Sequence, residues 1–295
     1  MISVEHLSKY YGNFLAVDNI SFEIEEGHVY GFLGPNGAGK STTMNIMTGC
    51  LSATSGHVRI DGFDIFEDPD KAKRQIGYLP EHPPLYLNDT PMEYLRFVGE
   101  AKGLHREELD RQIEEVIQKT GIYGVRNRRI SNLSKGYRQR VGIAQALLGN
   151  PKVIILDEPT VGLDPLQIIE IRDLIKELGQ SHTVIFSSHI LSEVQRHCTR
   201  AGVIRDGRLI ACGKVEDLAD TGARRVLVRG IPDLTGLPGV RGLEHLEDGV
   251  RFLYSGSMQS LLQTLAAAPV RDVQITEPDL EEVFLHYYTQ GGDPA

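Results

Sequence analysis

The chain has 295 residues, enough for one large domain and a smaller one. Its formal charge of −9 and isoelectric point near 5.6 argue against a general nucleic-acid-binding protein, which needs a basic face. Its three cysteines are far apart in the sequence, which argues against a zinc site or a disulfide framework. No signal peptide is predicted at the amino terminus, and no stretch approaches the unbroken apolar length of a membrane span.

Two segments near the amino terminus alternate apolar and polar residues. Residues 2–7 and 19–25 therefore predict half-buried antiparallel strands. Tyr11 lies between them, just before Gly12. An aromatic side chain there either stacks on a base or fills space in the structure, and both interpretations stay open at this point.

A phosphate-binding loop is predicted directly after the apolar run at residues 29–33. The next nine residues fit the pattern G-x-x-x-x-G-K-[ST], in which glycines let successive N–H groups converge on a phosphate at a helix start. Lys40 would reach the β- and γ-phosphates of a nucleoside triphosphate, and the Ser41 hydroxyl would bind its Mg²⁺. The strand-to-helix context disfavours a mere glycine-rich turn. The predicted phosphate-binding residues are Gly34, Pro35, Asn36, Gly37, Ala38, Gly39, Lys40, Ser41 and Thr42.

The next part of the chain changes from α/β to helical. A helix over 40–50 and a strand at 57–60 are followed by a buried strand at 76–80, which ends at Glu81. Thr90-Pro91-Met92-Glu93 has the form of a capping box, and an apolar stripe follows between 109 and 117. The segment at about 82–133 is thus predicted to be a helical subdomain inserted in an α/β core.

The α/β core resumes at residues 153–156, a continuous apolar run typical of a parallel strand covered on both faces. This strand delivers Asp157 and Glu158 at its carboxyl end, where ligands of open α/β sheets bind. A helix is predicted from Asp164-Pro165 to Gly179, and a strand at 183–187 leads to His189. Strands that alternate with helices indicate a parallel sheet.

Three of these polar residues suit phosphoryl transfer to water, which needs Mg²⁺, charge neutralisation and a group that orients the water. Asp157 is predicted to hold the Mg²⁺, and Glu158 to polarise the water. A lone histidine after a strand is usually structural, but the shared sheet favours contact between His189 and the γ-phosphate. Glu158, His189 and Lys40 form the predicted catalytic set.

A polar turn precedes the apolar helix that runs through residues 141–147. Ser134 is predicted to cap this helix, and Gly136 would let a phosphate approach free backbone N–H groups. Taken alone, the turn is an ordinary helix start.

The composition shifts beyond Cys212, where glycines and a proline interrupt the chain between 236 and 242. Short strands at 225–228, 251–254 and 270–276, with two helices, are predicted to form a small α/β appendage. The predicted domains are residues 1–215 and 216–295.

The order of the motifs resembles that of the ATP-binding cassette (ABC) ATPases over about residues 2–215. The tail at 277–285 resembles the end of cassettes from drug-efflux, sodium-efflux and gliding-type exporters. This resemblance implies an α/β P-loop NTPase core with an antiparallel β subdomain. It rests on the phosphate loop, Gly77-Tyr78-Leu79-Pro80-Glu81, Leu133-Ser134-Lys135-Gly136, residues 154–158, Gly162-Leu163-Asp164 and Ser188-His189.

The resemblance also implies partners. Two cassettes pair head to tail in this family, so Ser134 and Gly136 would serve the nucleotide of a second copy or a paralogue, and Asp164 would link the two sites. Tyr11 would stack on adenine, and Glu81 would bind Mg²⁺. The helical segment would receive a coupling helix from a separate transmembrane permease subunit, which implies a cytoplasmic protein at the inner face of the membrane.

Two residues depart from the usual pattern of the family. Glu81 stands where glutamine is usual, and the signature reads L-S-K-G-Y in place of L-S-G-G-Q. A glutamate oxygen can still bind Mg²⁺. Unlike glutamine, however, glutamate can be charged or neutral, so its protonation changes the charge of the site. The transported substance, the pairing with an identical or a related copy, and the role of the C-terminal domain stay open.

Two rival functions are a soluble cassette that acts on ribosomes or DNA and a regulator that senses ATP without hydrolysing it. The first kind carries two cassettes or a long coiled coil, whereas one phosphate loop is present here and only 93 residues separate Lys40 from Ser134. Glu158 and His189 weigh against the second. The sequence therefore predicts an ATP-hydrolysing subunit of an export-type transporter.

Overall fold

The computed structural model describes residues 1–219, 223–230, 234 and 237–276. The chain divides into two compact units, Met1–Gly213 and Lys214–Ala295. The exporter-like tail at 277–285 lies outside the described residues.

An antiparallel sheet forms the first part of the larger unit, and its strands lie in the order β2-β1-β4-β5. The predicted alternation is confirmed, because Ile20, Phe22 and Ile24 are buried on one face of β2. β1 runs on to Tyr11, four residues further than predicted, so that Tyr11 pairs with Phe14 across the turn to β2. The strands are β1 (Ile2–Tyr11), β2 (Phe14–Ile24), β4 (Ser55–Ile60) and β5 (Phe63–Asp64).

The second sheet is the α/β core, with six strands in the order β10-β9-β3-β8-β7-β6. β9, β3, β8, β7 and β6 pair in parallel, as predicted for the strands at 29–33, 76–80, 153–156 and 183–187. Every residue of β3 and β7 is buried. The strands are β3 (Val29–Leu33), β6 (Ile76–Leu79), β7 (Val153–Leu156), β8 (Thr183–Ser188), β9 (Arg200–Arg205) and β10 (Arg208–Lys214).

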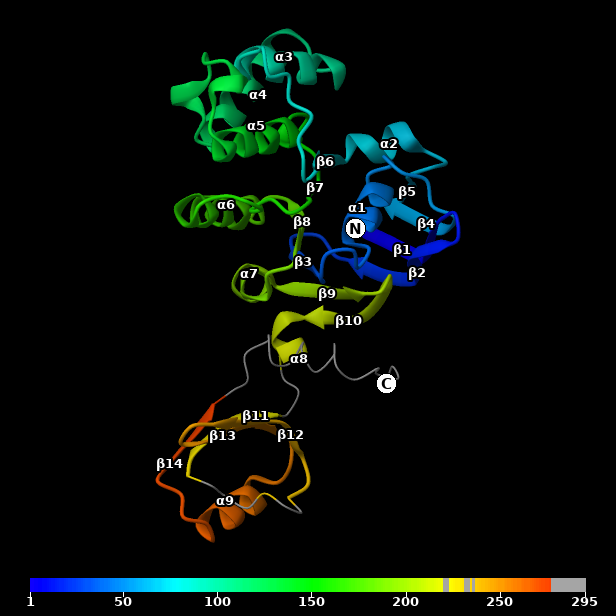
Figure 1. The fold of residues 1–295 in the computed structure, drawn as a ribbon. Helices are drawn as coiled ribbons and strands as arrows, with labels where there is room; N and C mark the ends of the chain where they lie inside the picture. Colours follow the sequence, from blue (N-terminus) through cyan, green and yellow to red (C-terminus); the bar gives the residue numbers. More distant parts are fainter. Residues whose placement is uncertain (220–222, 231–233, 235–236, 277–295) are drawn as a thin grey trace. The chain divides into compact units, whose positions relative to one another are not determined.

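Helices connect the core strands and form a separate group between β6 and β7. α3, α4 and α5 lie together on one side of the larger unit (Figure 1). The capping box of α3 is present, since the Glu93 N–H donates to Thr90 Oγ1 at 3.3 Å and the Thr90 N–H donates to Glu93 Oε2 at 2.8 Å. The helices of the unit are α1 (Lys40–Met47), α2 (Pro69–Arg74), α3 (Pro91–Ala101), α4 (Arg106–Lys119), α5 (Lys135–Leu147), α6 (Pro165–Leu178) and α7 (Leu191–His197).

The smaller unit contains an antiparallel sheet in the order β12-β13-β11-β14, with α9 packed on one face. Val226, Phe252 and Leu261 lie in the core between this sheet and α9. β12 escaped prediction because Gly242 interrupts its pattern at a register shift between Arg241 and Glu244. The elements are α8 (Val215–Ala219), β11 (Arg224–Arg229), β12 (Val240–Leu246), β13 (Gly249–Tyr254), α9 (Met258–Ala266) and β14 (Asp272–Thr276).

Candidate functional site

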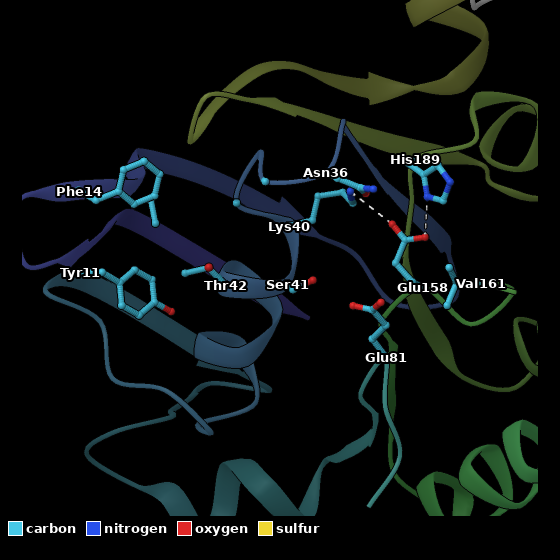
Figure 2. Close-up of a pocket in the computed structure, with 13 residues that line it drawn as sticks. Tyr11, Phe14, Asn36, Lys40, Ser41, Thr42, Glu81, Glu158, Val161 and His189 are labelled. Atoms are coloured by element: carbon cyan, nitrogen blue, oxygen red, sulfur yellow. Dashed lines mark hydrogen bonds and ion pairs between the residues drawn. The ribbon is translucent and has the colours of Figure 1, made fainter.

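A pocket of about 420 Å³ collects the predicted nucleotide-binding residues at one edge of the core sheet. β3, β6, β7 and β8 are parallel and end at this edge, so the residues that follow them converge. Figure 2 shows the phosphate loop, Glu81, Glu158 and His189 facing the same space. The pocket is lined by Tyr11, Phe14, Ala16, Asn36, Gly37, Gly39, Lys40, Ser41, Thr42, Glu81, Glu158, Val161 and His189.

The phosphate loop between β3 and α1 requires glycine at two positions. Gly37 and Gly39 have φ of 82° and 106°, in the left-handed region where other residues are strained. A side chain on Gly37 would meet nothing within 4 Å, so this part of the loop faces open space. Within the described part of the chain no side chain caps α1 at Gly39. The first N–H groups of the helix can therefore bind an anion.

Lys40 lies almost fully buried beneath the loop, with 5% of its side chain exposed. Its Nζ donates to the carbonyl oxygens of Gly34 at 2.8 Å and Pro35 at 3.1 Å. The same nitrogen lies 3.3 Å from Glu158 Oε1. The Lys40 ammonium group thus connects the phosphate loop to Glu158 (Figure 2).

Both the backbone N–H and the side-chain carboxylate of Glu158 have defined partners. Its N–H donates to Ser187 Oγ at 2.8 Å, and its φ of 46° places a non-glycine backbone in a strained conformation common at functional sites. Oε2 lies 2.9 Å from His189 Nδ1. Oε1 is buried and has no hydrogen-bond donor among the described residues, beyond the ion pair with Lys40. Such an acceptor suits a ligand or water that brings its own proton.

Asp157 lies beneath the pocket and is 2% exposed. Its Oδ1 accepts hydrogen bonds from Ser187 Oγ at 2.6 Å and Ser41 Oγ at 3.1 Å. Burial raises the pKa of Asp157 above its ordinary value, and the negative charges of Glu158 and Glu81 act in the same direction. The two hydrogen bonds oppose this shift without cancelling it. A cation bound beside Asp157 would offset the cost of burying its negative charge.

The oxygens of Ser41, Glu81 and Asp157 fit a magnesium ion, which prefers hard oxygen ligands. Among the described residues there is no group of three or more carboxylates, histidines or cysteines that could hold a metal ion alone. Mg²⁺ is commonly shared between one or two carboxylates and substrate phosphates. The donor set therefore fits a metal that arrives with a phosphate ligand.

Two aromatic rings line the pocket on the side opposite Glu158 and His189 (Figure 2). Tyr11 was predicted as a binding residue, and Phe14 was not. Tyr11 and Phe14 are 49% and 65% exposed and face the pocket together in Figure 2. Lys9 Nζ lies 5.4 Å from the centre of the Tyr11 ring. The sequence signal that could have identified Phe14 is its position two residues after Gly12. A tight turn at Gly12 places the rings of Tyr11 and Phe14 together at one end of the β1–β2 pair.

Seven predicted binding residues lie outside this pocket lining: Gly34, Pro35 and Ala38 of the loop, Asp157 beside it, and Ser134, Gly136 and Asp164, which follow later in the chain. Ser134 caps α5, since its Oγ accepts the Tyr137 N–H at 3.4 Å, and Asp164 caps α6, since its Oδ1 accepts the Gln167 N–H at 2.9 Å. Gly136 is buried, and a side chain there would approach the Gln167 carboxamide at 2.5 Å. The signature turn and the start of α6 are thus packed on each other within one chain.

Ser187 is a site residue that the sequence did not reveal. Its hydroxyl donates to Asp157 and accepts from the Glu158 N–H, so it holds both acidic residues from the neighbouring strand β8. Nothing in a run of strand residues marks one serine for this contact.

A parallel sheet whose first strand leads through a phosphate-binding loop into a helix, with an acidic pair after a neighbouring strand, defines a P-loop nucleoside triphosphatase. Comparison with known proteins identifies the family within this class. The chain belongs to the ATP-binding subunits of ABC transporters, which are ATPases, and the ABC transporter family model matches residues 17–161.

Relatives of known name support this membership, one of them over nearly the whole chain. It is 34% identical over 304 residues to the linearmycin resistance ATP-binding protein LnrL of Bacillus subtilis, with 97% of each chain covered. It is 39% identical to the bacitracin transport ATP-binding protein BcrA of Bacillus licheniformis, over 71% of this chain and 68% of that one. The dimeric cassette MJ0796, solved with ADP and Pi, is similar with a TM-score of 0.66 and 27% identity, over 73% of this chain and 99% of that one.

Proposed function

We propose that this chain powers an ABC exporter and that Glu158 orients the water that attacks the terminal phosphate of ATP. The observation that supports this role is the position of the Glu158 carboxylate between Lys40 and His189, beside the phosphate loop. Oε1, which has no hydrogen-bond donor among the described residues, is the atom that can accept a proton from water.

The other residues of the pocket bind and orient. Lys40 and the N–H groups of residues 34–42 would bind the phosphates, and Tyr11 would stack on the adenine. His189 would hold Glu158 and contact the γ-phosphate. In the 2.9 Å contact with Glu158 Oε2, the His189 Nδ1 would donate to the carboxylate. Ser41, Glu81 and Asp157 would hold Mg²⁺, which supplies neutralisation of phosphate charge when bound.

A second cassette would complete the site. Ser134, Gly136 and Asp164 lie outside the pocket of their own chain, and Ser134 stands exposed at the start of α5. We assign Ser134 and Gly136 to the nucleotide of a second copy or a paralogue, and Asp164 to the link between the two sites. The dimeric solved relative supports this arrangement.

The helical group would contact a transmembrane permease. Tyr86, Leu87 and Phe97 are 50%, 48% and 48% exposed, and the rings of Tyr86 and Phe97 lie 5.1 Å apart. Clustered exposed apolar side chains mark interaction surfaces. None of the described helices is long and apolar enough to cross a membrane. On the basis of the family and of this exposed cluster, we place the chain at the inner face of the membrane, with residues 1–215 as the ATPase domain and 216–295 as an accessory domain.

Replacement of Glu158 by glutamine tests the assigned role. Glu158→Gln keeps the shape of the side chain but removes the base, so phosphate release should fall by about 10²- to 10⁴-fold. Binding of Mg-ATP, measured by calorimetry, should persist. Glu177→Gln, an exposed change on α6, is the matched control. Normal turnover by Glu158→Gln would show that another group orients the water.

A further inference from the structure

We propose that Glu193 is a positioning residue that fixes the distance between Glu158 and His189. The proposal rests on the hydrolytic roles proposed for those two residues. Glu193 lies on α7, four residues after His189, and is 1% exposed.

One carboxylate contacts both segments that carry the hydrolytic pair. Glu193 Oε2 accepts a hydrogen bond from Ser188 Oγ at 2.8 Å, and Ser188 directly precedes His189. Thr160 Oγ1 lies 3.1 Å from Oε1 and 3.2 Å from Oε2, and Thr160 follows Glu158 by two residues. Thr160 and Ser188 are themselves buried. Glu193 thus joins the end of β8 to the turn after β7 without lining the pocket.

The two joined segments are otherwise tight turns. The Val161 N–H donates to the Glu158 carbonyl at 3.1 Å, and the Ile190 N–H donates to Ser188 Oγ at 2.9 Å. Short turns of this kind transmit a displacement at one residue to the next. A shift of Thr160 relative to Ser188 would therefore change the 2.9 Å contact between Glu158 Oε2 and His189 Nδ1.

Arg172 on α6 balances the charge of this carboxylate. Its Nη2 lies 2.6 Å from Glu193 Oε1, and 20% of the Arg172 side chain is exposed. A buried ion pair is weak evidence for stability, because apolar side chains of similar volume often stabilise a fold as well or better. The charge of Glu193 is better explained by the two hydroxyl groups that it orders than by packing.

The loss of this carboxylate should affect turnover rather than nucleotide binding. In the described part of the chain, the Glu193 carboxylate bonds to Thr160, Arg172 and Ser188 and to none of residues 34–42. Misplacement of a water-orienting group by a fraction of an ångström slows the chemical step strongly. A residue that only maintained the fold would alter stability and leave kcat per folded molecule unchanged.

The test compares full-length Glu193→Gln with wild type, measuring kcat and KM for Mg-ATP by phosphate release and the Kd by calorimetry. We expect kcat to fall at least tenfold while KM and Kd stay within twofold. Glu177→Gln, which removes an exposed charge from α6, should leave all three constants unchanged. An unchanged kcat in folded Glu193→Gln would overturn the proposal, as would a rise in KM without a fall in kcat.

Two further variants keep the proposal testable if Glu193→Gln does not fold. Thr160→Val and Ser188→Ala each remove one hydrogen bond to the carboxylate, and each should lower kcat several-fold at constant Kd. Combined with Glu193→Gln, either change should add little, because the variants act on one network. Full additivity, or no effect of either hydroxyl, would overturn the proposal. Glu158→Gln separates the two hypotheses: normal turnover there would defeat the proposed function, whereas loss of turnover there with normal Glu193→Gln would defeat this inference alone.

Discussion

The rings of Tyr11 and Phe14 differ in role from their neighbour Tyr10, although all three are exposed. Tyr10 and Tyr11 are 48% and 49% exposed, yet only Tyr11 lines the pocket. Successive side chains of a strand point to opposite faces of a sheet, so neighbours on β1 cannot share one pocket. Flat aromatic rings at a phosphate pocket suit a purine base, since stacking needs no specific hydrogen bond.

This placement predicts unequal effects of three alanine substitutions. Tyr11→Ala and Phe14→Ala should each weaken Mg-ATP binding about 5- to 100-fold, the usual range for loss of a base–aromatic stack. Tyr10→Ala, the matched control, should leave the Kd unchanged. Isothermal calorimetry on the three variants checks this, and equal losses for Tyr10 and Tyr11 would exclude a stacking role.

At the scale of elements, the end of α5 joins the helical group to the core sheet. Lys102, just after α3, donates to the carbonyl oxygens of Leu148 at 2.7 Å and Gln145 at 3.1 Å. Gln145 Nε2 in turn donates to the Tyr78 carbonyl on β6 at 2.6 Å, three residues before Glu81. A displacement of α3 by a membrane partner can therefore reach the pocket through α5 and β6.

The Lys102 ammonium, which lies against backbone carbonyl groups although the residue is partly exposed, predicts a pH-dependent stability. Burial lowers the pKa of Lys102 to about 8, from 10.5 for an ordinary lysine. Between these values the unfolded chain binds more protons than the folded one, so the free energy of unfolding rises with pH. From pH 7.5 to 9.5 wild type should gain stability relative to Lys102→Met, by less than the about 1 to 2 kcal/mol that a fully buried ammonium would give, because part of the Lys102 side chain is exposed.

Urea denaturation of both proteins at the two pH values measures this difference. Lys176→Met, an exposed lysine on α6, should track wild type throughout. A constant difference between wild type and Lys102→Met across the range would contradict the lowered pKa.

For the whole molecule, the absence of Ser134 from the pocket lining fits the proposal that a second copy completes the site. Lys40 lines the pocket, whereas Ser134 stands at the start of α5 and caps that helix. In a two-fold symmetric pair, the Ser134 of one copy would face the phosphate loop of the other.

Mixing two inactive variants tests this arrangement. Lys40→Ala lacks the phosphate ligand and Ser134→Arg blocks the signature, so each alone should be inactive. Mixed in equal amounts, half of the dimers would carry one intact site, and activity should recover to roughly one quarter of wild type. Phosphate release after mixing is the measurement. No recovery in a mixture that forms dimers would place Ser134 in the site of its own chain.

The sequence by itself determined the phosphate loop, the acidic pair after β7 and His189 after β8, because each belongs to a local strand-to-turn pattern. It also predicted a parallel sheet, and parallel strands end at a common edge, so the convergence of these residues followed. It did not predict β9, β10 or β12: β9 is a short buried segment, β10 is partly exposed and β12 is largely exposed, so none of them has a clear apolar alternation.

Only the tertiary structure decided which residues hold the site in place through hydrogen bonds without lining the pocket. Ser187 reaches Asp157 and Glu158 across neighbouring strands, and Glu193 reaches Thr160 from a helix 33 residues further along the chain. Serine, threonine and glutamate occur throughout the chain with no local pattern to mark these three. Their contacts depend on the order β3-β8-β7-β6, and strand order is set by packing of the whole sheet rather than by any one segment.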